Sequence, residues 1–290
     1  MAPIAKRDID GTTLAYVERG GGDPVVFVHG SASDYRTWQS QLDEFGREYR
    51  AIAYSRRYHW PNEPIPEHAD YAMDQHVDDL RELLSSLGTG PVHLVGHSYG
   101  AFVGLLLAVR EPGLLRTLVL TEPPVVTLFV HTVPRPLEML RLLLRRPRTA
   151  AAIMKFGTKG IGPTTAAARR GDMEEAMRIF GHAVLGPEFY RRLSPARLDQ
   201  IRANSIKAEF LGSGLAPLEG EALRGVRTPT LLVTGHHSPS VFPRMIDRLE
   251  ELLPHTGRIE IAGASHIVHE DNPRAFNAAV ASFLAAHRAP

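Results

Sequence analysis

The sequence predicts an α/β protein built on a mostly parallel β-sheet, with a helical insertion. Through the first 122 residues, short apolar runs typical of strands alternate with longer segments of helical periodicity. Strand patterns then stop, and they return only at Pro229. The chain has 290 residues, of which 43% are hydrophobic, enough to bury the core of one such domain and an insertion.

The expected elements follow from these patterns. Strands are predicted at 5–8, 13–18, 25–28, 50–54, 92–95, 118–121, 230–234 and 258–261, and helices between them at 35–45, 73–87, 101–108 and 275–285. In the region without strands, helices are predicted at 137–144, 164–170, 173–185 and from Ser194-Pro195 onward. We therefore predict a core of residues 1–122 and 226–290, with a helical cap inserted at 123–225.

The pentapeptide Gly96-His97-Ser98-Tyr99-Gly100 lies between a predicted strand and a predicted helix. A G-x-S-x-G sequence in this position is typical of a nucleophile elbow. The turn strains the serine backbone, and a Cβ at Gly96 or Gly100 would collide with the adjoining strand or helix. Because the turn exposes the serine hydroxyl beside the first free N–H groups of the helix, Ser98 is the candidate nucleophile.

A serine nucleophile needs a base, and His266 is the candidate. It follows the last predicted strand in Gly263-Ala264-Ser265-His266, on the loop before the final helix. His269 is the competitor. It lies nearer the helix, and we expect it to order the loop.

For the third member, the acid that orients the base, the sequence offers more than one candidate. It commonly follows the strand at 230–234, but Ser238 stands where a carboxylate is expected. Glu122 ends the strand next to the elbow strand, and the two prolines after it predict an extended backbone at Glu122. We favour Glu122, with Asp247 and Asp271 as alternatives.

Taken together, these motifs make the chain resemble the cap-bearing branch of the α/β-hydrolase superfamily. The signals are His29-Gly30 after an early strand, the elbow at Ser98, the strand ending in Glu122, and the 263–266 sequence. The resemblance covers residues 1–122 and about 226–290, and it implies an eight-stranded, mostly parallel sheet flanked by helices, with a cap after Glu122. The acid position is similar to that of haloalkane dehalogenases and some resorcylic-lactone hydrolases. Dehalogenases and epoxide hydrolases use an aspartate nucleophile, so a serine favours acyl chemistry instead.

The resemblance also implies where an oxyanion would bind. The backbone N–H of Tyr99 is one expected donor, and the N–H of Ser31, after His29-Gly30, is the other. A hydroxyl donor from Ser31 or Ser33 is an alternative.

Residues from two segments are candidates for the substrate-binding wall. They are Tyr58 and Trp60 in the loop after the strand at 50–54, and Leu128, Phe129 and Met139 after Glu122, together with Ser31. For each of these large side chains, packing in the core or anchoring of a loop is the competing interpretation.

Composition restricts the possible partners. The chain has no cysteine, which excludes disulfides and thiolate metal sites, and its net charge of +1 gives no reason to expect nucleic acid. No leader or long apolar run is evident, so we expect a cytoplasmic protein without a membrane partner. The adjacent His236-His237 pair does not match a metal motif, and no dinucleotide fingerprint appears, so no metal or cofactor is expected. The four arginines of residues 141–148 suggest either an anionic partner or, as we favour, a solvated face of the cap.

The sequence therefore predicts a serine hydrolase that cleaves an ester or lactone of a small to medium apolar substrate, and the aromatic side chains of Tyr58 and Trp60 suit a ring-bearing one. Ser98 attacks, His266 transfers the proton, Glu122 stabilises the imidazolium, and water releases the acyl group. Three alternatives remain open: a carbon–carbon bond hydrolase, a lyase in which His266 acts as base, and a small-molecule receptor. The sequence predicts no oligomeric state.

Overall fold

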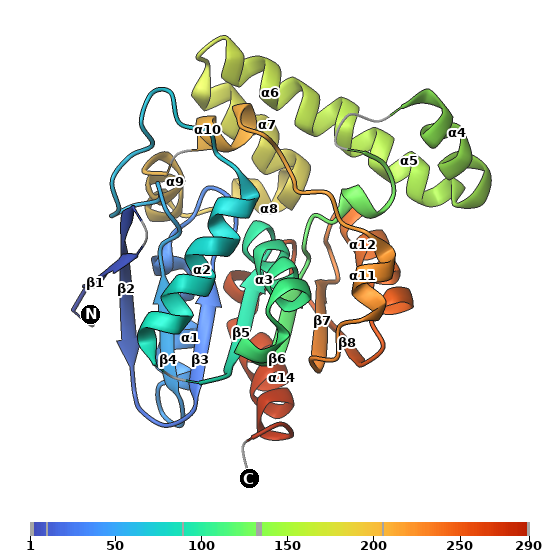
Figure 1. The fold of residues 1–290 in the computed structure, drawn as a ribbon. Helices are drawn as coiled ribbons and strands as arrows, with labels where there is room; N and C mark the ends of the chain where they lie inside the picture. Colours follow the sequence, from blue (N-terminus) through green and yellow to red (C-terminus); the bar gives the residue numbers. More distant parts are fainter. Residues whose placement is uncertain (1–2, 10, 89, 132–134, 205, 289–290) are drawn as a thin grey trace.

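The computed structural model describes residues 3–9, 11–88, 90–131, 135–204 and 206–288. Its centre is one eight-stranded sheet in the order β1-β2-β4-β3-β5-β6-β7-β8 (Figure 1). The strands are β1 (Ala5–Ile9), β2 (Thr12–Arg19), β3 (Pro24–Val28), β4 (Arg50–Tyr54), β5 (Val92–His97), β6 (Leu115–Thr121), β7 (Thr230–Gly235) and β8 (Thr256–Ile261). β2 is antiparallel to both β1 and β4, and all the other pairs are parallel. The predicted fold class is confirmed.

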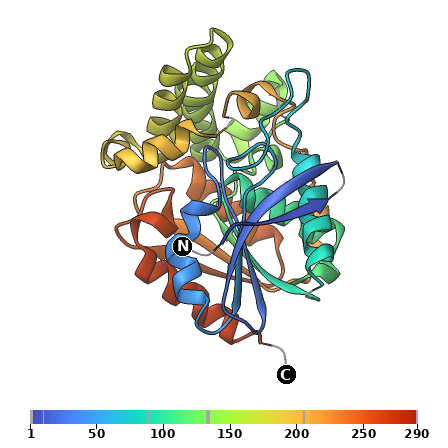
Figure 2. The same ribbon diagram turned by 90° about the vertical axis from the view of Figure 1, so that its left-hand side faces the viewer.

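Helices cover both faces of this sheet (Figure 2). The helices of the core are α1 (Gln39–Phe45), α2 (Met73–Leu87), α3 (Tyr99–Arg110), α12 (Val241–Leu252), α13 (Val268–Asp271) and α14 (Pro273–Ala285). Apolar side chains of α2, α3 and α12 pack in one buried cluster, and those of α1 and α14 pack in another. Because both faces are covered, β3, β5 and β7 are buried along their whole length.

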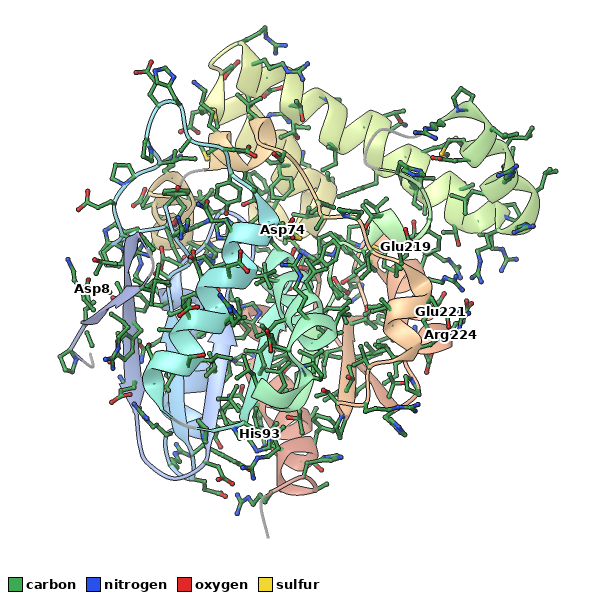
Figure 3. All side chains as sticks on the ribbon, in the orientation of Figure 1. Asp8, Asp74, His93, Glu219, Glu221 and Arg224 are labelled. Carbon is green, nitrogen blue, oxygen red and sulfur yellow. The ribbon has the colours of Figure 1, made fainter. Side chains whose placement is uncertain are left out.

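The two ends of the sheet have different surroundings. The carboxyl ends of the parallel strands point towards the cap, whereas His93, near the start of β5, lies at the opposite end (Figure 3). His93 is fully buried, and its Nδ1 atom lies 2.8 Å from the hydroxyl oxygen of Thr117 on β6. This end of β5 is therefore structural, and the elbow lies at the other end.

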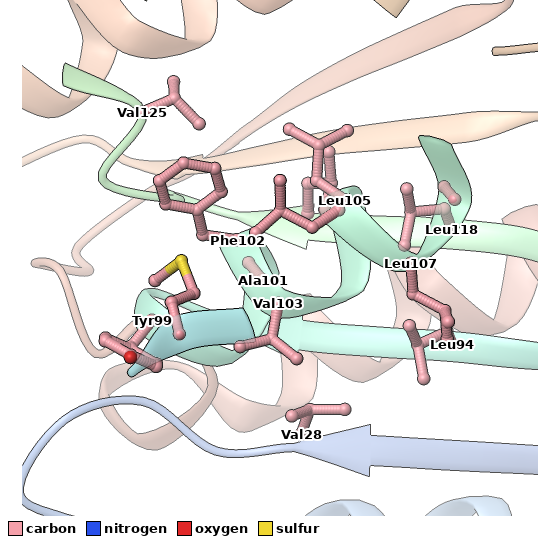
Figure 4. Packing of buried hydrophobic residues seen from close by; sticks show 14 of the residues in the cluster. Val28, Leu94, Tyr99, Ala101, Phe102, Val103, Leu105, Leu107, Leu118 and Val125 are labelled. Atoms are coloured by element: carbon pink, nitrogen blue, oxygen red, sulfur yellow. The ribbon is translucent and has the colours of Figure 1, made fainter. Parts of the chain in front are cut away.

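Helix α3 shows how the sheet holds the elbow (Figure 4). Phe102, Val103, Leu105 and Leu107 of this helix are fully buried and belong to the larger apolar cluster. The helix approaches the sheet so closely that a Cβ on Gly104 would lie 2.7 Å from Leu94 Cδ2. This packing fixes the first turn of α3, where the elbow begins.

The inserted helices lie between β6 and β7 in the chain and above the carboxyl ends of the strands (Figure 1). They are α4 (Pro136–Arg145), α5 (Pro147–Phe156), α6 (Gly162–Arg169), α7 (Met173–Leu185), α8 (Pro187–Arg191), α9 (Pro195–Arg202) and α10 (Ile206–Leu211), followed by α11 (Gly220–Arg224) beside α12. A π-helical segment, Gly157–Ile161, joins α5 to α6. Helices α5, α8, α10 and α11 were not predicted, because short helices without a long apolar periodicity leave little signal in the sequence.

Within the described ranges, no helix combines the length and apolar character that crossing a membrane requires.

Candidate active site

The elbow joins β5 to α3 at Ser98, whose backbone has φ 51° and ψ −120°. A serine with positive φ is strained, as the sequence predicted. A Cβ on Gly96 would lie 2.5 Å from Ala101 Cα, and one on Gly100 would lie 2.4 Å from the carbonyl oxygen of Val28. The expected collisions with helix and strand are therefore present, and they explain why both positions are glycine.

Three side chains from separate strand ends form one hydrogen-bonded chain. The Ser98 hydroxyl lies 3.0 Å from Nε2 of His266, and Nδ1 of His266 lies 2.6 Å from Oε2 of Glu122. All three residues are buried, and Glu122 is completely so. Since a carboxylate only accepts, Nδ1–H donates to Glu122, which leaves Nε2 free to accept the serine proton.

Glu122 is held by β7 as well as by His266. Its Oε1 atom accepts hydrogen bonds from the Thr234 hydroxyl (2.6 Å) and the Gly235 N–H (2.9 Å). The expected extended backbone is wrong, because Glu122 has φ 48°. The left-handed turn directs the side chain across the end of β7, where both carboxylate oxygens find donors.

The alternative acids have other partners. Asp247 accepts hydrogen bonds from Arg244 (3.1 Å) and Arg258 (2.9 Å) on the outer side of α12. Asp271 accepts from the Ser265 N–H (2.7 Å) and hydroxyl (2.6 Å), and burial raises the pKa of its carboxyl group. The structure therefore brings only Glu122 of the three to His266.

His269 also lies away from Ser98. Its ring stacks on Trp38 with 4.1 Å between centroids, and its Nε2 atom lies 3.0 Å from the Thr37 hydroxyl. Burial lowers the pKa of His269 to about 4. These contacts agree with the expectation that His269 orders the loop.

Sequence reasoning missed three residues that position the base and the acid. The first is Thr234, which donates to Glu122, and the other two contact His266. Nε2 of His97 donates to the backbone oxygen of His266 (2.9 Å), and the Phe242 ring stacks on the His266 ring with 3.9 Å between centroids. Burial holds the pKa of His97 well below its usual value, so this residue is a neutral donor. The place of His97 inside the elbow was a usable signal, whereas nothing in the sequence linked Phe242 to His266.

The predicted oxyanion donors lie beside Ser98. Tyr99 is the first residue of α3, and the N–H of such a residue has no acceptor within its helix. A Cβ on Gly30 would lie 2.8 Å from His97 Nδ1, so only glycine lets the Ser31 loop approach the elbow this closely. The Ser31 hydroxyl donates to Glu209 of α10, and burial raises the pKa of that glutamate.

His29 shapes the same loop. Its ring is fully buried, Nδ1 donates to the Gly30 oxygen (2.8 Å), and Nε2 accepts from the Arg56 N–H (2.9 Å). Both ring nitrogens are therefore used in holding the loop.

A small cavity of about 50 Å³ lies over Ser98 and His266. Ser31 and Arg197 line it, and the rest of its wall is mainly apolar: Met177, Phe180, Val184, Leu185, Tyr190, Leu193, Ile201 and Ile267. Most of these side chains come from α7, α8 and α9 of the insertion.

The other predicted wall residues are not among those that line this cavity. The Trp60 ring is covered by Arg36, 3.9 Å from its centroid, and contacts Tyr35. Tyr58, Leu128, Phe129 and Met139 pack against the larger apolar cluster. The contacts of these five side chains therefore match the competing interpretation, which was core packing or loop anchoring. A role for these side chains in binding substrate stays a prediction.

The described side chains include no group of three or more His, Asp or Glu residues arranged to hold a metal ion. His236 pairs instead with Glu260 on the surface, with 2.7 Å between Nδ1 and Oε1.

Comparison with known proteins places the chain in a family. Residues 25–279 match the model of the alpha/beta hydrolase family, and the chain belongs to this family. The chain is 27% identical over 282 residues to 2-(acetamidomethylene)succinate hydrolase from Mesorhizobium japonicum, covering 97% of this chain and 95% of the relative. It is 24% identical over 297 residues to epoxide hydrolase 4 from Mus musculus, covering 94% and 77%. The enol-lactonase from Burkholderia xenovorans has the same fold, with a TM-score of 0.75, 18% identity, and coverage of 97% of this chain and 100% of that one.

Proposed function

We propose that this protein is a serine hydrolase that cleaves an ester or lactone through an acyl-enzyme. The single observation that carries the proposal is the hydrogen-bonded chain from Ser98 through His266 to Glu122. A hydroxyl becomes a useful nucleophile only when a base accepts its proton and an acid orients that base.

In the proposed reaction, Ser98 Oγ attacks the substrate carbonyl while Nε2 of His266 takes its proton. Glu122 stabilises the imidazolium and keeps the proton of Nδ1 in place. The N–H groups of Tyr99 and Ser31 bind the oxyanion, and each such donor contributes roughly 3 kcal/mol to stabilising the transition state. The imidazolium then protonates the leaving group, and water, activated by the same histidine, releases the acid.

The cavity wall supports an apolar substrate. Met177, Phe180, Val184 and Leu185 of α7 lie over Ser98, and they favour an apolar group beside the scissile carbonyl. An epoxide is less suitable, because the related epoxide hydrolases are expected to use an aspartate where this chain has Ser98.

Hydrolysis of a different carbonyl compound, such as an enamide or a ketone with cleavage of a carbon–carbon bond, is the second candidate. The relative named 2-(acetamidomethylene)succinate hydrolase, which matches nearly the whole chain, favours it. The same three side chains would serve in that reaction.

Labelling with a fluorophosphonate, followed by a panel of p-nitrophenyl esters and lactones, tests the proposal. Wild-type protein should be labelled once, and Ser98→Ala should lose the label and lower kcat by roughly 10⁴-fold or more on any ester that is turned over. Near-normal turnover by Ser98→Ala would rule out the acyl-enzyme.

A further inference from the structure

Helix α4 of the insertion exposes four large apolar side chains. The exposed fractions are 56% for Leu137, 51% for Leu140, 46% for Leu143 and 75% for Leu144. Only three other large hydrophobic residues in the described part of the chain are comparably exposed, Ile4, Met154 and Leu211. More than half of the exposed large hydrophobics thus lie on one helix of ten residues.

The four leucines share one side of α4. Leu137, Leu140 and Leu144 recur at the spacing i, i+3, i+7, which places them in one stripe along a helix. Leu142, which lies on the opposite side by the same geometry, is buried in the larger apolar cluster. The helix is thus anchored by one side and leaves its leucine stripe exposed. It lies at the outer edge of the cap, beyond α5 (Figure 1).

Arg141 and Arg145 of α4 flank this leucine stripe on one side, and Arg148 lies in the first turn of α5. Arg141, Arg145 and Arg148 are exposed, and no hydrogen bond or ion pair joins any of them to a carboxylate of the described residues. Arg146 differs from them, because it pairs with Glu251 at 2.6 Å. Two unpaired cations therefore border the exposed leucines on α4, and a third begins the next helix.

We propose that α4 docks on the surface of an anionic lipid bilayer. Leucines on one side and arginines at the border are what a helix lying in a membrane interface requires, since the leucines enter the acyl boundary while the guanidinium groups meet lipid phosphates. This departs from the expectation of no membrane partner. That expectation rested on the lack of a leader and of a long apolar run, and the sequence did not show that the leucines of α4 are exposed.

A second copy of the chain fits this surface less well. Two-fold pairing of α4 through its leucines would place the unpaired arginines of both copies in one interface, where like charges repel. A ten-residue helix is about 15 Å long and about 10 Å wide, so one face of it covers roughly 150 Å², far less than the roughly 800 Å² that each partner buries in a stable interface. A bilayer needs no such matched area.

Co-sedimentation with lipid vesicles tests this proposal directly. The full chain is mixed at low salt with phosphatidylcholine vesicles that either contain or lack phosphatidylglycerol. The variants are Leu140→Gln/Leu144→Gln and Arg141→Gln/Arg145→Gln/Arg148→Gln, and Ile4→Gln is a matched control at an exposed apolar position outside α4. The midpoint of thermal unfolding shows that each variant is folded, and this readout does not depend on any hydrolase activity.

Wild-type protein and Ile4→Gln should sediment with the phosphatidylglycerol vesicles, and high salt should weaken the binding. Removing three interfacial arginines should lower the partition coefficient by roughly 100-fold, and the leucine variant should lower it by at least about 10-fold. The proposal is overturned if wild-type protein does not bind anionic vesicles, or if either folded variant binds them as wild type does. Self-association that is lost in the leucine variant, without vesicle binding, would assign the stripe to a second copy instead.

Discussion

The Nδ1 atom of His266 lies 2.6 Å from Oε2 of Glu122, although 144 residues separate the two in the chain. The carboxylate reaches the histidine from the end of β6. This is one strand away from the loop after β7, which is where the acid was first expected. In that loop, Ser238 is half-buried, and its buried hydroxyl oxygen has no hydrogen-bond partner among the described residues. The contact explains how a histidine base is oriented without an acid after β7.

Glu122→Gln tests the role of this carboxylate. The amide fits the same space but removes the charge that stabilises the imidazolium, and it alters the preferred tautomer of His266. We expect kcat on an ester to fall by up to roughly 10⁴-fold, with KM less affected. Asp247→Asn, which lies on the outer side of α12, is the matched control and should remain near wild type. Full activity of the first variant with collapse of the second would assign the acid to Asp247.

A carboxylate at position 238 should partly restore the lost activity. The Ser238 hydroxyl lies 2.8 Å from the position of a Cβ on Gly235, whose N–H binds Glu122. Adding Ser238→Asp to Glu122→Gln should therefore place a charge close to His266 and recover part of kcat. If the double variant is no faster than Glu122→Gln alone, position 238 does not reach the base.

Replacing His266 or His269 with alanine, one at a time, tests which of the two histidines is the base. His266→Ala should abolish fluorophosphonate labelling, because no other imidazole of the described residues lies within hydrogen-bond distance of the Ser98 hydroxyl. His269→Ala should keep the label and instead lower the stability, since it removes a buried ring from Trp38. Intact-mass measurement shows whether each variant has gained the mass of the fluorophosphonate label. Labelling lost only in His269→Ala would mean that the base is misassigned.

Thr234 positions the acid, and Thr234→Val removes one donor from Glu122 while keeping the shape of the side chain. The Gly235 N–H remains, so the carboxylate should stay in place but be held less firmly. A hydrogen bond to a charged group is worth about 1.5–3 kcal/mol, and we expect kcat to fall roughly 10-fold to 100-fold. Thr234→Ser, which keeps the hydroxyl, should recover most of this loss. Equal losses in the two variants would point to packing instead of hydrogen bonding.

Much of this fold was predictable because its signals are local. The helix Met73–Leu87 and the strand Arg50–Tyr54 have the bounds that apolar periodicity predicts. The G-x-S-x-G turn carries its own steric requirement, so Ser98 could be placed from five residues. Features that depend on contacts between distant segments could not be predicted in this way. The stacking of Phe242 on His266 and the left-handed backbone of Glu122 depend on how β6, β7 and α12 meet in three dimensions, which no short sequence window records.

The wall of the cavity was the least predictable part. Tyr58 and Trp60 were chosen as large aromatic side chains in a loop, yet the guanidinium group of Arg36 packs over the face of the Trp60 ring. The residues that do line the cavity come mainly from α7 to α9, where apolar side chains serve helix packing and cavity lining alike. A sequence pattern cannot separate these two uses.

Stability should fall on acidification. Burial lowers the pKa of both His93 and His269 to about 4, below the usual value of about 6.5. Between these pH values the unfolded chain binds protons that the folded protein does not, so the free energy of unfolding decreases as the pH falls from about 6.5 towards 4. Each histidine contributes up to about 3 kcal/mol to this loss. Urea unfolding at neutral and acidic pH measures this loss of stability. A free energy of unfolding that stays level or rises on acidification would contradict the lowered pKa values of the two histidines.

The acyl-enzyme is the central claim, and its direct test is a mass measurement on the protein itself. Wild-type protein is mixed with a p-nitrophenyl ester that it turns over, quenched in acid within the first turnover, digested, and analysed by peptide mass spectrometry. We predict that the peptide containing Ser98 gains the mass of the acyl group, and that Ser98→Ala under the same conditions gains none. Release of p-nitrophenol in a full first turnover with the Ser98 peptide unmodified throughout would contradict the account.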